Sequence, residues 1–322
     1  MRINRAAIIG SGTIGRGWIP LFARAGIEVR VHDIDPASVE TAIAAAAATL
    51  RDLQAFGLVE DADRAIELIR PAASLAGALE GAEFIQESVP EKVATKRAVL
   101  AQLDGAAEAE AIVSSSCSSL DPAEIFEGVA NPRRCIVTHP FNPPHLMPLV
   151  EVLPGPGTDE EVVTRTSALM KELGQVPVVI RKFVFGYVAN RLQAAVLDEA
   201  MSLVGDGVIS PADLDLCITQ ALGRRWAFMG PFETADLNAD EGVAGYSARY
   251  RESYEAIGAD LGVARPWGED ALRQVIAARR RIVPLEGLQE KREWRDLLLM
   301  EMIANPIGDR GIRPLTQKEK RS

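Results

Sequence analysis

Residues 5–33 read RAAIIGSGTIGRGWIPLFARAGIEVRVHD. A short apolar run leads into a glycine-rich loop, an apolar stretch follows, and a β-branched run closes the segment. This order predicts a strand over Arg5–Gly10, a helix over Thr13–Ala25 and a second strand over Glu28–Asp33. Strands that alternate with helices in this way form parallel sheets with helices packed on their faces.

The glycine-rich loop is typical of a dinucleotide site. Gly10, Gly12 and Gly15 stand in the pattern G-x-G-x-x-G, directly after a strand and at the start of a helix. The first glycine permits a tight turn, the second lets the backbone approach a pyrophosphate, and the third allows close packing of helix on strand. The first helical turn, with Thr13 and Ile14, presents free N–H groups and a positive dipole end to the phosphates.

Asp33 indicates which dinucleotide the loop binds. It ends the second strand 18 residues after Gly15, where a carboxylate accepts hydrogen bonds from a ribose diol and repels a 2′-phosphate. Ile34, Asp35 and Pro36 follow it and provide no cation for such a phosphate. The segment therefore predicts NAD rather than NADP, although an aspartate here also fits a turn or a helix cap.

The rest of the chain divides into a mixed half and a helical half. Further strands are predicted at Glu83–Val89 and Ala111–Ser114. Later patterns are helical, beginning with Gly186–Gly205, and strand-like alternation almost disappears. We predict an α/β protein: a Rossmann-type doubly wound sheet in an NAD-binding domain of residues 1–184, followed by an all-helical substrate and dimerisation domain of residues 185–322.

Composition and charge exclude several classes of function. The 322 residues include 35 Lys and Arg against 45 Asp and Glu, a formal net charge of −10, whereas a nucleic-acid partner requires a basic face. No apolar run approaches about 18 residues, so we expect no membrane span, and the apolar run near the first residue is too short for a signal peptide. Three scattered cysteines and three histidines predict a reducing, cytoplasmic setting and no metal site.

A candidate catalytic pair flanks a proline-rich turn. Residues 137–153 read VTHPFNPPHLMPLVEVL, in which Leu149–Leu153 is the returning strand. If the chain reverses about His145, then His139 faces Glu151. An imidazole there can accept a hydroxyl proton while a hydride leaves the same carbon, and a carboxylate on its other nitrogen orients it. The spacing alone also fits a histidine with a structural role.

Several separate motifs follow the order of one enzyme family. They are GSGTIG, SVPE, SSSCSSL, THPFNPPHLMPLVEV and FGYVANRL, and with them the chain resembles the 3-hydroxyacyl-CoA dehydrogenase superfamily along nearly its whole length. The stretches VISPADLDLCITQALG, GRRWAFMGPFETADLNA and REWRD are most similar to its lambda-crystallin / L-gulonate 3-dehydrogenase branch. The resemblance implies an NAD-dependent oxidoreductase that acts on a CH–OH group.

The resemblance also implies roles for individual residues. His139 matches the catalytic base of the family and Glu151 its partner. Ser118 matches the serine that hydrogen-bonds the substrate oxygen, next to Cys117, where many relatives have threonine. Asn190 matches the asparagine that completes the site, and a neutral amide there can donate to an oxygen as negative charge gathers on it. Without the family, a serine cluster indicates a flexible loop and a helical asparagine a structural amide.

Cofactor and substrate contacts are implied in the same way. Glu91 and Lys96 match positions near the nicotinamide ribose; without the family they are ordinary charges on a helix face. Arg225 stands in Arg224-Arg225-Trp226, where the gulonate and carnitine branches resemble this chain in placing an arginine. A guanidinium binds the carboxylate of a short 3-hydroxy acid bidentately. We expect Arg224 to be solvated, and a surface ion pair remains the alternative for Arg225.

The expected reaction is oxidation of the 3-hydroxyl of a small hydroxy acid, with L-gulonate first, because carnitine-oxidising relatives tend to have aspartate at the position of Asn190. L-Carnitine and a 3-hydroxyacyl-CoA such as 3-hydroxybutyryl-CoA are the alternative substrates. A crystallin-like structural protein and a nucleotide-binding sensor are the non-enzyme alternatives, and the presence of each expected catalytic residue favours the enzyme. A homodimer is the default expectation for its assembly.

Overall fold

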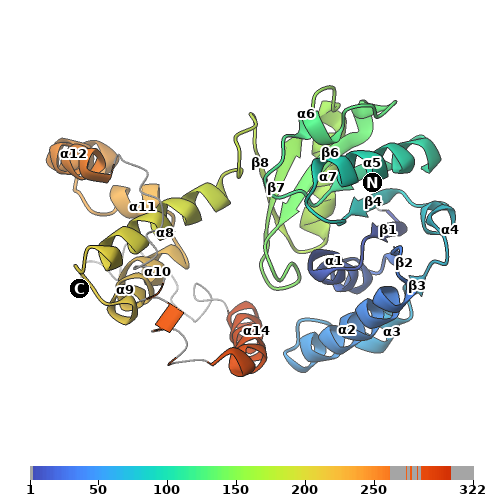
Figure 1. Cartoon of the computed structure of the whole chain (residues 1–322), viewed down its shortest axis with the longest axis horizontal. Coiled ribbons are helices and arrows are strands. Elements are labelled where there is room, and N and C mark those ends of the chain that lie inside the picture. The colour runs from blue at the N-terminus through green and yellow to red at the C-terminus, as the bar shows by residue number, and fades with distance from the viewer. Residues whose placement is uncertain (1–2, 262–272, 274–275, 278–280, 282–283, 306–322) are drawn as a thin grey trace, which may run out of the picture. The chain divides into compact units, whose positions relative to one another are not determined.

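The computed structural model describes residues 3–261, 273, 276–277, 281 and 284–305 (Figure 1). The chain forms two compact units, of which the first comprises Met1–Asn190 with Leu299–Ala304 and the second comprises Arg191–Leu298 with Asn305–Ser322. The predicted boundary after residue 184 stays a prediction, and residues 262–272 and 306–322 of the predicted helical domain lie outside the described residues.

An eight-stranded sheet forms the middle of the first unit. Its strand order is β3-β2-β1-β4-β5-β6-β7-β8, and every neighbouring pair is parallel except β6 with β7. The strands are β1 (Arg5–Ile9), β2 (Glu28–His32), β3 (Ile69–Pro71), β4 (Phe84–Glu87), β5 (Ile112–Ser115), β6 (Cys135–Pro140), β7 (Leu149–Pro154) and β8 (Val176–Val179). This topology confirms the predicted Rossmann-type sheet.

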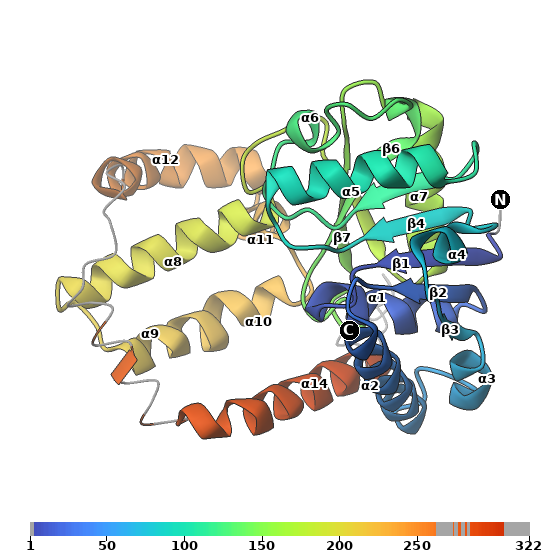
Figure 2. The ribbon, with the colours of Figure 1, turned by 45° about the vertical axis from the view of Figure 1, so that its right-hand side comes forward.

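Helices cover both faces of the sheet (Figure 2). Along β1, Ala6 and Ile8 pack with α1, α2 and α7, whereas Ala7 and Ile9 pack with α4, α5 and α6 on the other face. Successive side chains of a strand point to opposite faces, so a strand buried on both sides is apolar throughout. The helices are α1 (Thr13–Arg24), α2 (Pro36–Ala55), α3 (Ala62–Ile66), α4 (Leu75–Leu79), α5 (Val93–Ala106), α6 (Pro122–Ile125), η1 (Pro132–Arg134) and α7 (Glu160–Glu172).

The regular elements in the described part of the second unit are all helices, without a strand. The elements are α8 (Ala189–Gly205), which starts in the first unit, α9 (Pro211–Cys217), the π-helical turn η2 (Ile218–Leu222), α10 (Gly223–Trp226), α11 (Pro231–Asp236), α12 (Gly242–Leu261), η3 (Leu285–Gly287) and α14 (Leu288–Ala304). Ser210 caps α9, since its hydroxyl accepts a hydrogen bond from the Asp213 N–H at 3.2 Å. Within the described ranges, each helix is too short or too polar to cross a membrane.

The first helix of the predicted helical domain begins later than its sequence pattern indicates. The prediction starts at Gly186, but α8 starts at Ala189. Gly186 and Tyr187 have φ values of 76° and 53°, in the left-handed region. Two such residues cannot continue a right-handed helix, so the chain turns once before α8 begins.

Candidate active site

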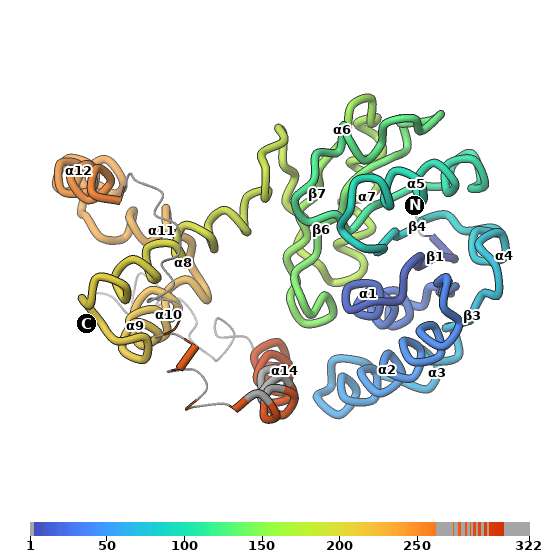
Figure 3. The backbone as a smooth tube through the Cα atoms, in the orientation of Figure 1, coloured from blue at the N-terminus to red at the C-terminus, as the bar shows by residue number. Residues whose placement is uncertain are grey.

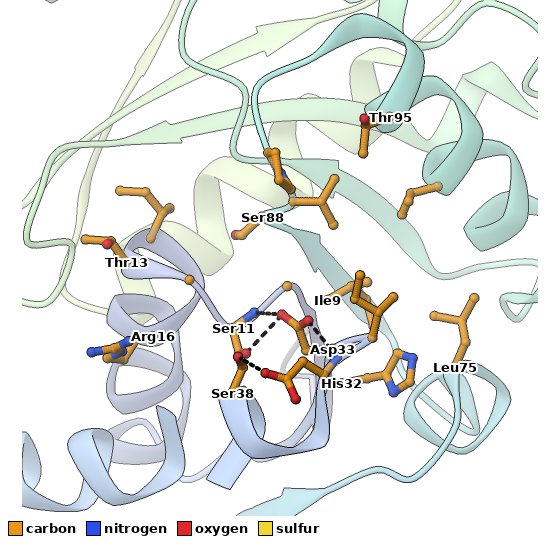
Figure 4. Close-up of a pocket in the computed structure, with 18 of the residues that line it drawn as sticks. Ile9, Ser11, Thr13, Arg16, His32, Asp33, Ser38, Leu75, Ser88 and Thr95 are labelled. Atoms are coloured by element: carbon orange, nitrogen blue, oxygen red, sulfur yellow. Dashed lines mark hydrogen bonds between the residues drawn. The ribbon is translucent and has the colours of Figure 1, made fainter. Parts of the chain in front are cut away.

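A pocket of about 750 Å³ lies where the chain order of the sheet reverses (Figure 4). From β1 the chain continues to β2 on one side, whereas β4 pairs with β1 on the other. Gly10, at the end of β1, and Ser88, at the end of β4, both line the pocket. Open α/β sheets bind ligands in the crevice at the carboxyl ends of their strands at such a point.

The three glycines of the loop have different surroundings. Gly10 has a φ of 94°, and a Cβ on it would lie 2.7 Å from the carbonyl carbon of Ser88. A Cβ on Gly15 would lie 1.9 Å from the Gly10 carbonyl oxygen. A Cβ on Gly12 would meet no described atom within 4 Å and would enter the pocket that this residue lines. Gly10 and Gly15 are therefore required by packing, while Gly12 leaves the backbone open to a ligand.

The start of α1 and the carboxylate of Asp33 give this pocket its polarity. No described side chain caps α1 or places an acid in its first turn, so the N–H groups at Thr13 and Ile14 and the helix dipole favour an anion. Asp33 Oδ2 accepts hydrogen bonds from the Ser11 N–H at 2.7 Å and the Ser11 hydroxyl at 3.0 Å. A pyrophosphate at α1 with a ribose near Asp33 fits this arrangement.

Hydrogen bonds keep Asp33 ionised. Burial raises the pKa of its carboxyl group, but the hydrogen bonds from Ser11, Asp35 and Ile34 outweigh burial and lower the pKa overall. Asp33 Oδ1 accepts the Asp35 N–H at 3.2 Å. Each carboxylate oxygen has more than one acceptor site, so the group can still bind a diol. The Ile34 side chain beside it is 98% exposed and lines the same pocket, an apolar surface for a base.

A second cavity of about 210 Å³ shares a wall with the first. Ser88 and Val89 line both cavities. Five of the predicted site residues also surround the smaller cavity: Ile14, Glu91, Lys96, Ser118 and His139. The structure therefore brings the predicted base and the glycine-rich loop to one place within the first unit.

His139 and Glu151 are opposite residues of the antiparallel strands β6 and β7, as a reversal about His145 predicts. His139 Nδ1 lies 2.8 Å from Glu151 Oε2, and the two residues are 5% and 2% exposed. An ionised carboxylate only accepts hydrogen bonds, so Nδ1 carries the proton of the neutral ring. Nε2 is then the unprotonated nitrogen, and the ring is arranged as a base.

The second oxygen of Glu151 also has partners. Oε1 accepts the N–H groups of Val188 at 3.0 Å and of Ala189 at 2.9 Å, at the start of α8. Burial raises the pKa of Glu151, but the hydrogen bond with His139 and those from the two backbone amides outweigh it and lower the pKa overall. Glu151 is thus a carboxylate stabilised from two sides.

The left-handed turn before α8 makes this contact possible. Figure 3 traces the backbone that leads into α8. Gly186 and Tyr187 adopt positive φ, and the next two residues direct their N–H groups to Glu151. The buried Tyr187 ring packs edge-on against His139 with centroids 5.5 Å apart, and its hydroxyl donates to the Leu120 carbonyl at 3.1 Å. Helix propensity does not reveal such a turn.

Ser118 is held by Glu91 in this structure. The Ser118 N–H and hydroxyl donate to Glu91 Oε1 at 2.7 and 3.0 Å, and the Ser119 N–H donates at 3.1 Å. The hydroxyl predicted to bind the substrate oxygen therefore donates to a carboxylate. Because the two backbone donors remain on that carboxylate oxygen, the hydroxyl can rotate toward a ligand without leaving Glu91 unsatisfied. Asn190 Nδ2 donates to the Ser118 carbonyl at 3.2 Å, which leaves its second N–H for another acceptor.

Without the family resemblance, Glu91 and Lys96 are interpreted as ordinary charges on a helix face. The structure shows a different environment for both. Glu91 precedes α5, and the Lys96 side chain is 1% exposed. Lys96 Nζ lies 3.0 Å from Glu87 Oε1 and 3.3 Å from Glu91 Oε2. Burial lowers the pKa of Lys96, but the charges of Glu87 and Glu91 raise it overall, so the lysine stays a cation.

Sequence reasoning missed Glu87, which lies at the end of β4 and is fully buried. It accepts hydrogen bonds from the Ser115 hydroxyl at 2.5 Å and the Val89 N–H at 2.6 Å. A carboxylate in a parallel strand that is buried on both faces requires a cation, and Lys96 nearby in the sequence was the available signal.

Arg224 and Arg225 belong to α10 of the second unit. Arg224 is exposed and Arg225 is half-buried. The expected contact of Arg225 with a substrate carboxylate stays a prediction.

Known proteins match the chain along most of its length. A sequence model described as the NAD binding domain of 3-hydroxyacyl-CoA dehydrogenase matches residues 5–183, and one described as its C-terminal domain matches residues 186–268. A lambda-crystallin of Oryctolagus cuniculus is 41% identical over 300 residues, 92% of this chain and 94% of the relative. An L-carnitine dehydrogenase of Oceanobacillus iheyensis is 38% identical over 265 residues, 82% of this chain and 83% of the relative.

A solved structure agrees with these matches. It is the crystal structure of 5-formyl-3-hydroxy-2-methylpyridine 4-carboxylic acid 5-dehydrogenase, an NAD⁺-dependent dismutase. The TM-score is 0.81 at 28% sequence identity, and the match covers 95% of this chain and 99% of that chain.

The charge of Glu151 makes a prediction about stability and pH. Since its pKa in the folded protein lies below the usual 4.5, the carboxylate stabilises the fold above that pH, and this stabilisation is lost as the pH falls through the folded pKa. We expect Glu151→Gln to be less stable than the unaltered chain near pH ~7 and the difference to shrink toward pH ~3. Urea unfolding across this range measures it.

Glu255→Gln, at an exposed position of α12, is the control and should change stability little at any pH. A stability difference for Glu151→Gln that does not vary with pH would show that shape rather than charge matters at this position.

Proposed function

We propose that this chain, which belongs to the 3-hydroxyacyl-CoA dehydrogenase family, oxidises the 3-hydroxyl of a small hydroxy acid, with L-gulonate as the first candidate. Enzymes of this family are NAD-dependent dehydrogenases that act on 3-hydroxy groups, and the chain is an NAD-dependent dehydrogenase. The observation that carries the proposal is the His139–Glu151 hydrogen bond, in which His139 lines a cavity that shares a wall with the dinucleotide pocket.

His139 is the proposed general base. Bound NAD⁺ supplies the acceptor for the hydride that leaves carbon 3 of the substrate. His139 Nε2 takes the proton of the 3-hydroxyl, and Glu151 stabilises the imidazolium that forms. Because the N–H groups of Val188 and Ala189 also donate to Glu151, the carboxylate stays ionised and in place when His139 becomes charged. In the reverse reaction the imidazolium returns the proton to the new alcohol.

Ser118 and Asn190 are proposed to hold the reacting oxygen. The Ser118 hydroxyl turns from Glu91 to that oxygen, and Asn190 offers the amide N–H that is not donated to the Ser118 carbonyl. Both donors are neutral. They therefore stabilise an oxygen on which negative charge develops, but they do not hold a substrate carboxylate at the position of that oxygen. The hydrogen bond from Asn190 Nδ2 to the Ser118 carbonyl, at 3.2 Å, keeps the two residues adjacent.

The cofactor contacts follow from the two cavities. Gly10, Gly12 and Gly15, with Thr13 and Ile14, are proposed to receive the pyrophosphate at the start of α1. Asp33 is proposed to accept the adenosine ribose hydroxyls, and Glu91 and Lys96 to contact the nicotinamide ribose.

Arg225 is the proposed partner of the substrate carboxylate. L-Gulonate is a carboxylate, and so are the compounds in the names of two relatives, L-carnitine and a pyridine 4-carboxylic acid. Arg225 is half-buried while the neighbouring Arg224 is exposed, and a partly desolvated guanidinium binds a carboxylate more strongly than a fully solvated one. The neutral amide of Asn190 favours a polyhydroxy acid over a trimethylammonium compound.

A cytoplasmic homodimer is the proposed setting. Large apolar side chains of the second unit are exposed, among them Phe228, Phe232 and Leu237 at 57%, 83% and 67%, and association of two chains covers such surface. The cysteines, which are free, support a reducing compartment.

Replacing the base tests the reaction. We expect His139→Gln to lower kcat for L-gulonate oxidation by about 10²–10⁴-fold, the usual contribution of general acid–base catalysis, while NADH still binds. Steady-state rates of NADH formation and a separate NADH titration measure the two effects. Near-normal turnover of the variant would exclude His139 as the base.

Replacing the arginine tests the substrate class. We expect the unaltered enzyme to oxidise L-gulonate in preference to L-carnitine and 3-hydroxybutyryl-CoA. Arg225→Ala should raise KM for L-gulonate by roughly 10–100-fold, since a bidentate charged contact is lost. Arg224→Ala is the matched control and should leave KM unchanged. An unchanged KM in Arg225→Ala, or a preference for the CoA ester, would contradict the carboxylate assignment.

A further inference from the structure

A buried chain of hydrogen-bonded polar side chains joins α1, the helix that follows the glycine-rich loop, to the ends of β4 and β5. Trp18 Nε1, on α1, donates to Ser116 Oγ at 3.0 Å, and Gln86 Nε2 donates to the same oxygen at 2.7 Å. Gln86 Oε1 accepts from Thr138 Oγ1 at 2.8 Å. Ser88 Oγ lies 2.8 Å from Ser116 Oγ. Trp18, Gln86 and Thr138 are fully buried and Ser116 is 8% exposed, so protein partners rather than bulk water satisfy these groups.

The chemistry of these groups sets the direction of each hydrogen bond. An indole N–H only donates, and the Gln86 amide nitrogen also donates, so the Ser116 oxygen accepts twice and both its lone pairs are used. The Ser116 proton is then available only to Ser88, whose oxygen accepts it. The hydroxyl proton of Ser88 remains, and the structure pairs it with no acceptor among the described residues.

Ser88 lies where that remaining proton can meet a ligand. Its backbone N–H donates to the Ile9 carbonyl at 2.7 Å, which fixes the residue beside the glycine-rich loop. Figure 4 shows its side chain on the wall of the larger pocket. The same residue lines the smaller cavity with His139. The half-buried Ser88 hydroxyl is thus a hydrogen-bond donor at the junction of the two cavities.

We propose that the Ser88 hydroxyl is a cofactor-binding donor that hydrogen-bonds an acceptor oxygen of the nicotinamide nucleoside half of NAD, and that Ser116 sets its direction. The adenosine half belongs with Asp33, which also lines the larger pocket. The nicotinamide half must approach His139 for a hydride to leave the carbon whose hydroxyl His139 deprotonates. That half therefore passes the junction, and its ribose and carboxamide provide oxygen acceptors for a neutral donor.

Ser38 provides a matched control within the same pocket. Its side chain also lines the larger pocket, but its hydroxyl donates to Asp35 Oδ2 at 2.8 Å. The Ser38 proton is therefore already used, and removal of this hydroxyl should cost a bound cofactor no hydrogen-bond donor.

Binding titrations without substrate test the proposal and are independent of which substrate the enzyme oxidises. NADH and AMP are titrated by calorimetry into the unaltered chain, Ser88→Ala and Ser38→Ala. We expect Ser88→Ala to weaken NADH binding by roughly three- to tenfold, the worth of one neutral hydrogen bond, and to leave AMP binding unchanged because AMP lacks the nicotinamide half. Ser38→Ala should bind both ligands as the unaltered chain does.

Unchanged NADH affinity in Ser88→Ala would overturn the proposal. An equal loss of NADH and AMP affinity would overturn it as well, because it would indicate a change in the whole pocket. Thermal unfolding of Ser88→Ala, expected at the midpoint of the unaltered chain, separates a lost contact from a damaged fold.

Discussion

The two oxygens of Glu151 hold the candidate active site together. One accepts the Nδ1 proton of His139, and the other accepts the N–H groups of Val188 and Ala189, where α8 begins. The first contact selects which ring nitrogen is free to act as a base, and the second keeps the carboxylate ionised in a buried position. A single side chain thus couples the β6–β7 hairpin to the left-handed turn at Tyr187, and the orientation of the imidazole depends on both.

A similar arrangement occurs elsewhere around the cavity, where hydrogen-bonded or charged partners position polar groups that line it. Ser118 is placed by Glu91, and Glu91 is neutralised by Lys96, whose charge is balanced by the buried Glu87. Buried charges are costly unless they are paired and hydrogen-bonded, so such a chain persists only where its members are satisfied together. The outcome is a set of polar groups with defined donors and acceptors before any ligand arrives, which is the condition for electrostatic stabilisation of a reacting oxygen.

Much of this arrangement could be predicted from the sequence because the signals are local. The strand, glycine loop and strand of residues 5–33 lie within a residue of their expected ends, and the symmetry of the hairpin about His145 places His139 opposite Glu151. The rest depends on contacts between distant segments. The environment of Glu87, the hydrogen bonds around Ser116, and the start of α8 follow from the register of parallel strands and from positive φ angles, which neither hydrophobic period nor helix propensity encodes.

Nitrogen NMR of the histidine side chains reports directly which ring nitrogen of His139 carries the proton. The chain has three histidines, so the signals of His139 can be assigned by comparison with His139→Gln. We expect the neutral ring to carry its proton on Nδ1, with a strongly hydrogen-bonded proton signal that disappears in Glu151→Gln. A neutral ring protonated on Nε2, or an Nδ1 signal that is indifferent to the loss of the carboxylate, would contradict this expectation.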